Sequence, residues 1–455
     1  MRRLVAVAWI AGCAGGVTPA PPARPLPVPA PVPDADRVPF SPDARVAELA
    51  VLRDALRDDY AHLETKRAQW GVDLDALFAR YAPRIRGAGT WVAYEAVMVA
   101  FVAELHDGHV QWRRKRGAGE TRRRIARLPL DTRFVGEQLI VTDVWSGAER
   151  AGLQRGDRIV ALDGTSIEER LGELERLRSW ARLDAARHDF AEEWVVSRVA
   201  TQGEVMARRL TRERTDGTYE TLAVVPDTTP RPGARPPRIE LTWRGRAAVL
   251  AVHDLTGHLR DTQQLATDAA AAAFASPHGL VIDLRDDEGG FEDAALAIAS
   301  RFTDRPVIGG STRVKLSAAA RAQQPAWREL PEDPAKPGWS TVQPLQAPAG
   351  APRAYPAPIA VVIDTGCRSS CESLALLLRA IGARLYGERT GGAGGAPITI
   401  ELPSSKAHVG IPARASFDTA GTPIEGVGVA PDESVAPTRA ELAAGRDVAL
   451  ERALA

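Results

Sequence analysis

The stretch Ile359-Ala-Val-Val-Ile-Asp-Thr-Gly-Cys-Arg-Ser-Ser-Cys-Glu-Ser-Leu-Ala-Leu-Leu-Leu-Arg379 decides the fold. Its first five residues are apolar and rich in β-branched side chains, as in a buried strand, and its leucine-rich end is typical of a helix. This order places Ser369 where the strand ends and the helix begins. The first N–H groups of a helix have no partner inside it and point at negative charge. A hydrolytic nucleophile needs this arrangement, although a simple helix N-cap at Ser369 or Ser370 explains the segment equally well.

Three further segments carry groups that suit hydrolysis. Gly279-Leu-Val-Ile-Asp-Leu-Arg-Asp-Asp-Glu-Gly-Gly290 is a buried strand that ends in a glycine pair, where bare backbone can approach a ligand and offer an amide to an oxyanion. Glu104-Leu-His-Asp-Gly-His-Val110 is a helix end with two histidines, and His has the pKa that suits a base at neutral pH. In Thr422-Pro-Ile-Glu-Gly-Val-Gly-Val-Ala-Pro-Asp432, Glu425 lies in a Gly-rich loop.

These motifs, taken in this order, resemble the C-terminal processing (tail-specific) serine peptidases, and within that group they are more similar to the tricorn-core branch. The resemblance extends from residue 41 to the C-terminus. It implies an α/β multidomain protein with an N-terminal helical bundle, a PDZ-like β-rich domain and an α/β catalytic domain. The catalytic domain is expected to have a mostly parallel sheet of the ClpP/crotonase-like kind. The resemblance implies a serine peptidase without cofactor or metal.

The resemblance also assigns catalytic roles. Ser369 becomes the nucleophile because it precedes Glu372 by three positions, as in the family's Ser-Ala-Ser-Glu pattern. His109 becomes the base, and Glu425 becomes the acid that orients the imidazole through a bridging group. His253 and His258, which flank the end of another apolar strand, remain alternative bases.

The oxyanion hole follows from the same resemblance. Ser370 offers its backbone N–H, and Gly289 or Gly290 supplies the second donor. Glu288 replaces the first glycine of the family's Gly-Gly-Gly turn. A carboxylate there would oppose the charge that the site must stabilise, so we expect its side chain to point outward. An inward carboxylate would leave a protein that binds peptides without cutting them.

Two departures from the family pattern concern the base. The processing proteases keep a Lys where this chain reads Thr390-Gly-Gly-Ala-Gly-Gly395, so a Ser-Lys dyad would require Lys406 to reach in from the next strand. In the tricorn branch a Ser can precede the catalytic His, and here that residue is Gly108. The sequence therefore favours a Ser-His pair.

The cysteines indicate an exported protein. Cys13 ends a signal that begins with Met1-Arg-Arg3 and continues with a short apolar run, so residues 1–13 resemble a bacterial lipoprotein signal with lipidation at Cys13. Ala14 rather than Asp follows, which favours the outer membrane of the cell envelope. An ordinary signal peptide is the alternative. Residues 14–40 form a tether rich in Pro and Ala.

The other two cysteines, Cys367 and Cys371, bracket the candidate nucleophile. In an exported protein they could form a disulfide that stiffens the turn, or remain free thiols, since spacing alone leaves both open. Zinc is disfavoured because His106-x-x-His109 lacks the spacing of a metalloprotease helix.

The remaining organisation follows from periodicity and punctuation. Residues 41–112 show helical apolar stripes, residues 125–226 carry a segment that resembles a PDZ core, and residues 238–455 alternate strands with helices. The PDZ-like segment is Ser146-Gly-Ala-Glu-Arg-Ala-Gly-Leu-Gln-Arg-Gly-Asp-Arg-Ile-Val-Ala-Leu-Asp-Gly164, and it predicts binding of an extended peptide along residues 130–140, unless it only packs against the catalytic domain.

Composition excludes other classes of partner. The 455-residue chain has a formal net charge of zero, and the basic run at residues 113–124 has little aromatic interleaving, so we predict a solvated loop and no nucleic-acid partner. The sequence thus predicts an exported serine endopeptidase that cleaves unfolded segments or C-terminal tails. A catalytically inactive peptide-binding lipoprotein scaffold is the alternative, and an esterase is disfavoured by the PDZ-like segment. Substrate and oligomeric state stay open.

Overall fold

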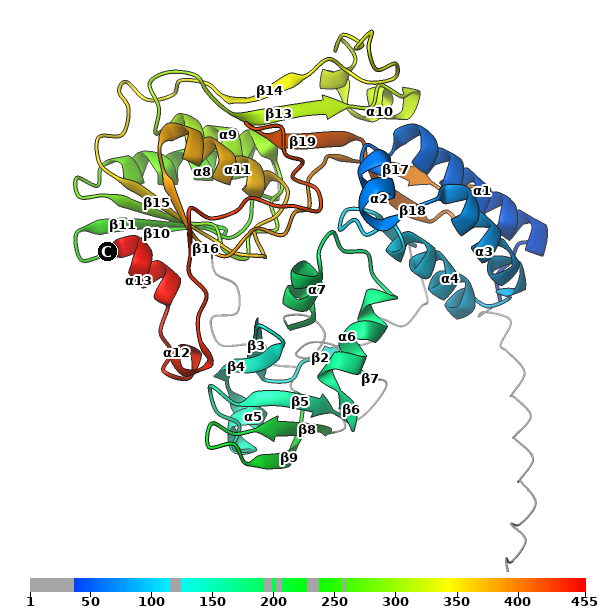
Figure 1. Cartoon of the computed structure of the whole chain (residues 1–455), viewed down its shortest axis with the longest axis horizontal. Helices are drawn as coiled ribbons and strands as arrows, with labels where there is room; N and C mark the ends of the chain where they lie inside the picture. Colours follow the sequence, from blue (N-terminus) through cyan, green and yellow to red (C-terminus); the bar gives the residue numbers. More distant parts are fainter. Residues whose placement is uncertain (1–36, 115–123, 192–198, 202–206, 227–236, 257–258) are drawn as a thin grey trace, which may run out of the picture.

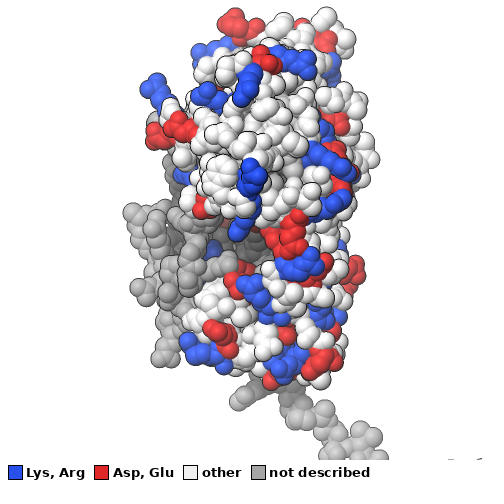
Figure 2. Space-filling view, turned by 90° about the vertical axis from the view of Figure 1, so that its left-hand side faces the viewer, with Lys and Arg blue, Asp and Glu red and all other residues white. Residues whose placement is uncertain are grey.

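The computed structural model describes residues 37–114, 124–191, 199–201, 207–226, 237–256 and 259–455. The predicted signal with Cys13, and most of the predicted tether, lie outside the described residues. Within the described residues, no helix combines the length and the apolar character that a bilayer crossing requires. On the face shown in Figure 2, basic and acidic residues are interspersed among uncharged ones, as the zero net charge leads one to expect.

Four helices form the N-terminal part (Figure 1). They are α1 (Pro42–Asp59), α2 (Leu63–Trp70), α3 (Leu74–Gly87) and α4 (Trp91–Ala103). Ser41 caps α1, because its side chain accepts a hydrogen bond from the Ala44 N–H, and a proline follows it in the first turn. The apolar stripes of these helices share one core with a three-stranded sheet in the order β1-β18-β17. Its strands are β1 (Gln111–Arg113), β18 (His408–Pro412) and β17 (Pro397–Glu401). The helices are therefore joined to the C-terminal part by a continuous core.

The middle domain lies between residues 124 and 226 and includes the segment that resembles a PDZ core. It is built on an antiparallel sheet in the order β3-β4-β5-β8-β9. Its strands are β3 (Leu130–Val135), β4 (Gln138–Val144), β5 (Arg158–Leu162), β8 (Arg208–Glu213) and β9 (Tyr219–Val224), and β6 (Thr165–Ser166) pairs with β5. Its helices are α5 (Ser146–Arg150), α6 (Ile167–Glu175) and α7 (Leu183–Asp189). A separate pair joins β2 (Arg124–Ala126) to β7 (Val199–Thr201). In the five-stranded sheet, β3 is an edge strand.

The α/β domain is built on a six-stranded sheet in the order β10-β11-β12-β15-β16-β20. The strands are β10 (Ile239–Arg244), β11 (Ala247–Val252), β12 (Leu280–Asp283), β15 (Ile359–Ile363), β16 (Arg384–Gly387) and β20 (Glu433–Ser434). β10 runs antiparallel to β11, and every other pair is parallel. An α/β multidomain fold with N-terminal helices and a mostly parallel sheet is thereby confirmed.

Helices cover both faces of this sheet (Figure 1). One face packs against α8 (Leu259–Phe274), α9 (Glu292–Ser300) and α11 (Ser370–Ile381), and the other packs against α13 (Val448–Leu454). The short α12 (Arg439–Ala443) precedes α13. A further three-stranded sheet, in the order β14-β13-β19, is accompanied by α10 (Ala318–Gln323) and η3 (Pro325–Trp327). Its strands are β14 (Gln343–Ala347), β13 (Val307–Val314) and β19 (Arg414–Asp418).

Candidate active site

Ser369 stands at the junction between β15 and α11, as the sequence predicts. Its backbone has φ 57° and ψ −122°, a conformation that side-chain-bearing residues rarely adopt. It occupies the N-cap position of α11 and belongs to a capping box with Glu372, whose carboxylate accepts the Ser369 N–H. The tight turn leaves part of Ser369 exposed to solvent.

Glu372 holds this turn in place from one turn into α11. Its carboxylate is 1% exposed and accepts four hydrogen bonds. Oε2 accepts from the N–H groups of Ser369 and Ala393, each at 3.1 Å, while Oε1 accepts from the Thr390 hydroxyl at 2.5 Å and the Gly392 N–H at 2.9 Å. Burial raises the pKa of Glu372 to about 7, although these hydrogen bonds act in the opposite direction.

The glycine-rich segment at residues 390–395 brings the predicted catalytic residues together. Ala393 accepts the Ser369 N–H at 3.1 Å, and the Gly394 N–H donates to Glu425 Oε2 at 3.1 Å. A Cβ placed on Gly108 would lie 3.7 Å from the Ala393 side chain. One short segment thus touches the nucleophile, the residue before His109 and the predicted acid.

His109 is partly exposed, but its Nδ1 is buried and has no hydrogen-bond partner in the described part of the chain. Its backbone N–H donates to Asp107 Oδ1 at 2.8 Å, which fixes the end of the loop after α4. Burial lowers the pKa of His109; the Asp107 charge raises it, and His62, Arg414 and Arg368 lower it further. The imidazole is therefore neutral at physiological pH, as a general base must be.

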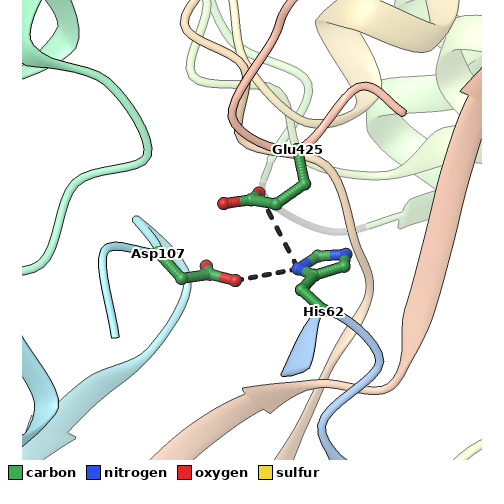
Figure 3. A group of neighbouring side chains, drawn as sticks. All are labelled: His62, Asp107 and Glu425. Carbon is green, nitrogen blue, oxygen red and sulfur yellow. Dashed lines mark hydrogen bonds and ion pairs between the residues drawn. The ribbon is translucent and has the colours of Figure 1, made fainter. Parts of the chain in front are cut away.

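Asp107 connects His109 to a buried polar network. Its Oδ2 pairs with His62 Nδ1 at 2.8 Å (Figure 3). The same oxygen accepts a hydrogen bond from the Tyr60 hydroxyl, also at 2.8 Å. Burial opposes the charge on Asp107, but the hydrogen bond and charge of His62, together with the charge of Lys66, hold the pKa of Asp107 well below its usual range. Asp107 is thus a buried carboxylate that anchors the His109 backbone.

Glu425 lies in the same network but not against His109. Its Oε1 forms an ion pair with Lys66 Nζ at 2.6 Å, and its Oε2 lies 3.8 Å from His62 Nδ1 (Figure 3). Among the described residues, no hydrogen bond or ion pair joins Glu425 to the imidazole of His109. Burial, followed by the Asp107 charge, raises the pKa of Glu425 to about 7, while Lys66 and His62 lower it. Any influence of Glu425 on His109 must therefore pass through these intermediaries.

This network also bears on metal binding. Donor atoms of His62, Asp107 and Glu425 lie within 4.8 Å of one another, which is close enough for shared coordination. The side chain of Lys66 is fully buried and already supplies a positive charge to Glu425. An ammonium in this position takes the electrostatic role that a cation would have.

The predicted oxyanion donors lie side by side. A Cβ on Gly289 would come within 2.9 Å of the Ser370 nitrogen, so the glycine turn is pressed against the start of α11. The Gly289 N–H, however, donates to Asp287 Oδ1 at 2.9 Å. Within the described residues, no acceptor is bonded to the N–H of Ser370 or to that of Gly290. Of the two glycines, Gly290 is therefore the one with an N–H available.

The side chains that raised questions in the sequence point away from this site or lie elsewhere. Glu288 is exposed, as we expected. Lys406 pairs with Glu401 at 3.3 Å and its side chain is 69% exposed, so it does not reach in to form a Ser-Lys dyad. The described backbone contact of His253 is to Arg238, and His258 lies outside the described residues.

Cys367 and Cys371 form a disulfide across the nucleophile turn. Both residues are fully buried. The bridge links the residue that ends the turn from β15 to the first turn of α11, with Ser369 between them. This resolves the choice that spacing alone left open.

Sequence reasoning missed Tyr60, His62 and Lys66. Tyr60 and His62 lie just before α2 and Lys66 lies on it, all more than forty residues before His109 in the chain. They contact residues that are distant in sequence, so no local sequence pattern marks them. Two histidines were noted in the loop after α4, but His106 instead stacks on Trp70 with ring centroids 4.0 Å apart. The only available signal was a polar cluster on one side of a short helix, which is usually solvated.

A serine on a strained strand-to-helix turn, with free helix N–H groups and a neutral histidine nearby, defines a serine hydrolase site. Residues 246–435 match peptidase family S41. This match lies within the α/β domain and agrees with the resemblance that the order of the motifs indicates. No curated protein matches it by sequence.

Solved structures show the same fold over most of the chain. Mature CPAF complexed with lactacystin is 16% identical in sequence and aligns with a TM-score of 0.70. The alignment covers 89% of this chain and 96% of that one. Mature CPAF is likewise 16% identical with a TM-score of 0.70, and it covers 89% of this chain and 94% of that one. At 16% sequence identity, this similarity shows a shared fold and nothing further.

Proposed function

We propose that this chain is an exported serine endopeptidase in which Ser369 attacks the peptide carbonyl and His109 takes up and returns the proton. The observation that carries the proposal is the geometry of the turn at Ser369. Its strained backbone places the partly exposed Ser369 next to the N–H of Ser370, which has no acceptor among the described residues, at the start of a helix. The match of residues 246–435 to peptidase family S41 supports the reaction class.

The first step forms a bond between Ser369 Oγ and the carbonyl carbon of the substrate. The carbonyl oxygen becomes an oxyanion, and the N–H groups of Ser370 and Gly290 are the donors for it. The positive end of the α11 dipole favours the same charge. The disulfide and Glu372 keep the turn in place before substrate arrives, so little reorganisation is needed during the reaction.

The proton follows from Ser369 to His109 and then to the leaving amine, after which water attacks the acyl-enzyme. His109 suits this cycle because its pKa lies below the ordinary value of 6.5, so it starts neutral. Asp107, Lys66 and Glu425 act as positioning residues. Asp107 binds the His109 backbone N–H, and Lys66 joins Glu425 to the carbonyl of His106.

The substrate we infer is an unfolded segment or a C-terminal tail. The middle domain supports this, since β3 is an edge strand to which an extended peptide can be added. Cys13 and the tether after it support a lipid anchor on the cell envelope, with the catalytic domain held near the membrane. Lipid attachment is tested by metabolic labelling with radioactive palmitate, which a Cys13→Ala variant should not incorporate.

Labelling with a fluorophosphonate probe tests the catalytic proposal. The full chain should react and should cut reduced, unfolded casein, and Ser369→Ala should do neither. Ser370→Ala is the matched control, because the role proposed for this residue uses its backbone N–H and leaves its hydroxyl unused. A chain that neither takes up the probe nor cuts casein, yet binds unfolded casein, would be a peptide-binding scaffold instead. Equal labelling of Ser369→Ala would assign the nucleophile to another residue.

A further inference from the structure

The sheet β1-β18-β17 has two different faces, and its strand β1 begins two residues after His109. Trp112, Val409 and Ile398 point into the core shared with the N-terminal helices. Because successive residues of a strand point to opposite faces, their neighbours lie on the other side. The register confirms this, since Gln111 is opposite Gly410 and Gly410 is opposite Thr399. The second face is therefore polar and is not covered by the helices.

This second face is hollowed into a pocket of about 470 Å³ next to the base. His109 itself lines the pocket, together with Gln111, Arg113, Thr399 and His408 from the three strands. Gly410 lies in the middle of the sheet, and a Cβ there would come within 3.1 Å of the His109 carbonyl oxygen. The absence of a side chain at this position keeps the space in front of His109 open.

Two arginines line the pocket, Arg113 and Arg114, and they differ in their partners. The exposed guanidinium of Arg113 donates to the Gln111 side chain, and no carboxylate among the described residues forms an ion pair with it. The neighbouring cationic groups differ in this respect. Arg114 is bonded to Glu95 at 2.7 Å, and His408 lies 3.5 Å from Glu401. Arg113 therefore presents an uncompensated, forked donor at the wall of the pocket.

The side of the scissile bond follows from the chemistry. The base must deliver its proton to the leaving amine, so a pocket lined by the base lies on the side of the leaving group. We propose that this pocket binds a carboxylate on the part of the substrate that follows the scissile bond, with Arg113 as its partner. The inference rests on the proposed function, because it uses His109 as the base.

A carboxylate can reach this pocket from two sources. It can be the side chain of an Asp or Glu, or it can be the terminal carboxylate of a short tail, in which case the pocket measures the distance from the cut to the chain end. Both have the planar geometry that an arginine binds with two parallel hydrogen bonds. The experiment therefore varies the two sources independently.

Binding of three short peptides to the full-length Ser369→Ala chain tests the inference without requiring turnover. The first has Glu at its second position and an amidated end, the second has Gln there and an amidated end, and the third has Gln there and a free end. Calorimetry should give a Kd about fivefold lower for at least one carboxylate peptide than for the neutral one, as expected for a partly exposed charged pair. The difference should shrink as salt reduces the Debye length below about 10 Å.

Second-site variants identify the partner. Adding Arg113→Gln should remove the preference, Arg113→Lys should keep part of it, and Arg113→Glu should reverse it in favour of the neutral peptide. Arg244→Gln is the matched control, since Arg244 is an exposed arginine at the end of β10. Equal affinities for all three peptides, or a preference that survives Arg113→Gln, would overturn the inference. Fluorophosphonate labelling of the unmodified chain reports on the proposed function separately, so either idea can fail alone.

Discussion

Replacement of Glu372 by Gln should loosen the nucleophile turn while leaving the rest of the molecule in place. The buried carboxylate accepts from four donors, two at each oxygen. A glutamine keeps one acceptor oxygen and turns an NH2 group toward the other pair of donors. One orientation sets that NH2 group against the N–H groups of Ser369 and Ala393. The opposite orientation sets it against the donors from Thr390 and Gly392.

The cost can be worked out from these contacts. A buried donor that loses its acceptor costs about 1–3 kcal/mol, so two of them cost about 2–6 kcal/mol of unfolding free energy. Glu372→Ala leaves three donors without an acceptor, because the Ser369 N–H keeps the Ala393 carbonyl, and should cost at least about 3 kcal/mol, a large part of the typical stability of about 5–15 kcal/mol. The Gln variant is therefore the informative one. Because the Ser369 N–H is one of the four donors, misplacement of its hydroxyl should lower kcat about 100-fold.

Urea unfolding and the rate of fluorophosphonate labelling together measure both effects. Glu329→Gln is the control for the loss of a charge, since Glu329 is exposed. The reasoning is refuted if Glu372→Gln unfolds within about 0.5 kcal/mol of the unmodified chain, the range expected for a surface change, and labels at the same rate. Loss of stability with full labelling would show that the turn holds Ser369 in position without the carboxylate.

Three further predictions concern the base and its surroundings. Because burial lowers the pKa of His109 from 6.5, the acidic limb of the kcat/KM profile for a small ester should have its midpoint below pH 6.5, and a midpoint above that value would contradict a buried neutral base. Lys66→Met leaves the Glu425 carboxylate buried and unpaired, so urea unfolding should show a loss of about 3 kcal/mol, most of which a second change, Glu425→Gln, should restore. Asp189→Asn removes the negative charge that pairs with Arg368 at 2.6 Å while keeping an acceptor oxygen there. Because Arg368 precedes the proposed nucleophile, the change should lower kcat about tenfold, about 1.4 kcal/mol, with little change in KM; unchanged kcat would argue against coupling across this contact.

The strand-to-helix turn at Ser369 could be predicted from sequence because its signals are local. Five apolar residues, a turn and a leucine-rich helix follow one another within about twenty positions, and each has its own periodicity. The glycine pair could be predicted for the same reason. What the sequence could not decide is which of the two glycines has a free N–H. That depends on a hydrogen bond from Gly289 to the Asp287 side chain, and such a contact has no signature in spacing.

The network around His109 could not be predicted, because its members are distant in sequence. Tyr60 and His62 meet Asp107 across more than forty residues, and Lys66 meets Glu425 across most of the chain. Each of these side chains is ordinary in its local context. Of these three, only Lys66 lies on the short helix α2, where a lysine normally faces solvent, and tertiary packing alone turns it inward. The contact between Lys66 and Glu425 could therefore not be predicted from the local sequence.

The middle domain, residues 124–226, contacts all three segments that carry the predicted catalytic residues. Residues 179–189, around α7, lie against the loop before His109, the turn before Ser369 and the loop after Glu425. Each contacted residue lies within two positions of a predicted catalytic residue. The contacts run from the Asp107 N–H to Ser179 Oγ at 2.7 Å, from Arg368 to Asp189 Oδ1 at 2.6 Å, and from Arg182 to the Val427 carbonyl at 2.5 Å.

These contacts make the geometry of the site depend on the whole chain. The α/β domain supplies Ser369 and Glu425, but His109 comes from the N-terminal part. The loop before His109 is held by Asp107, which binds the His109 N–H and the Tyr60 hydroxyl and donates its own N–H to Ser179. A shift of the middle domain would therefore disturb the loops that carry the proposed base and the proposed nucleophile, because its residues contact both Asp107 and Arg368. Since a misplacement of about 1 Å can cost about 100-fold in rate, small movements of this domain are sufficient to change activity. The catalytic unit of this protein is accordingly larger than the segment that matches peptidase family S41.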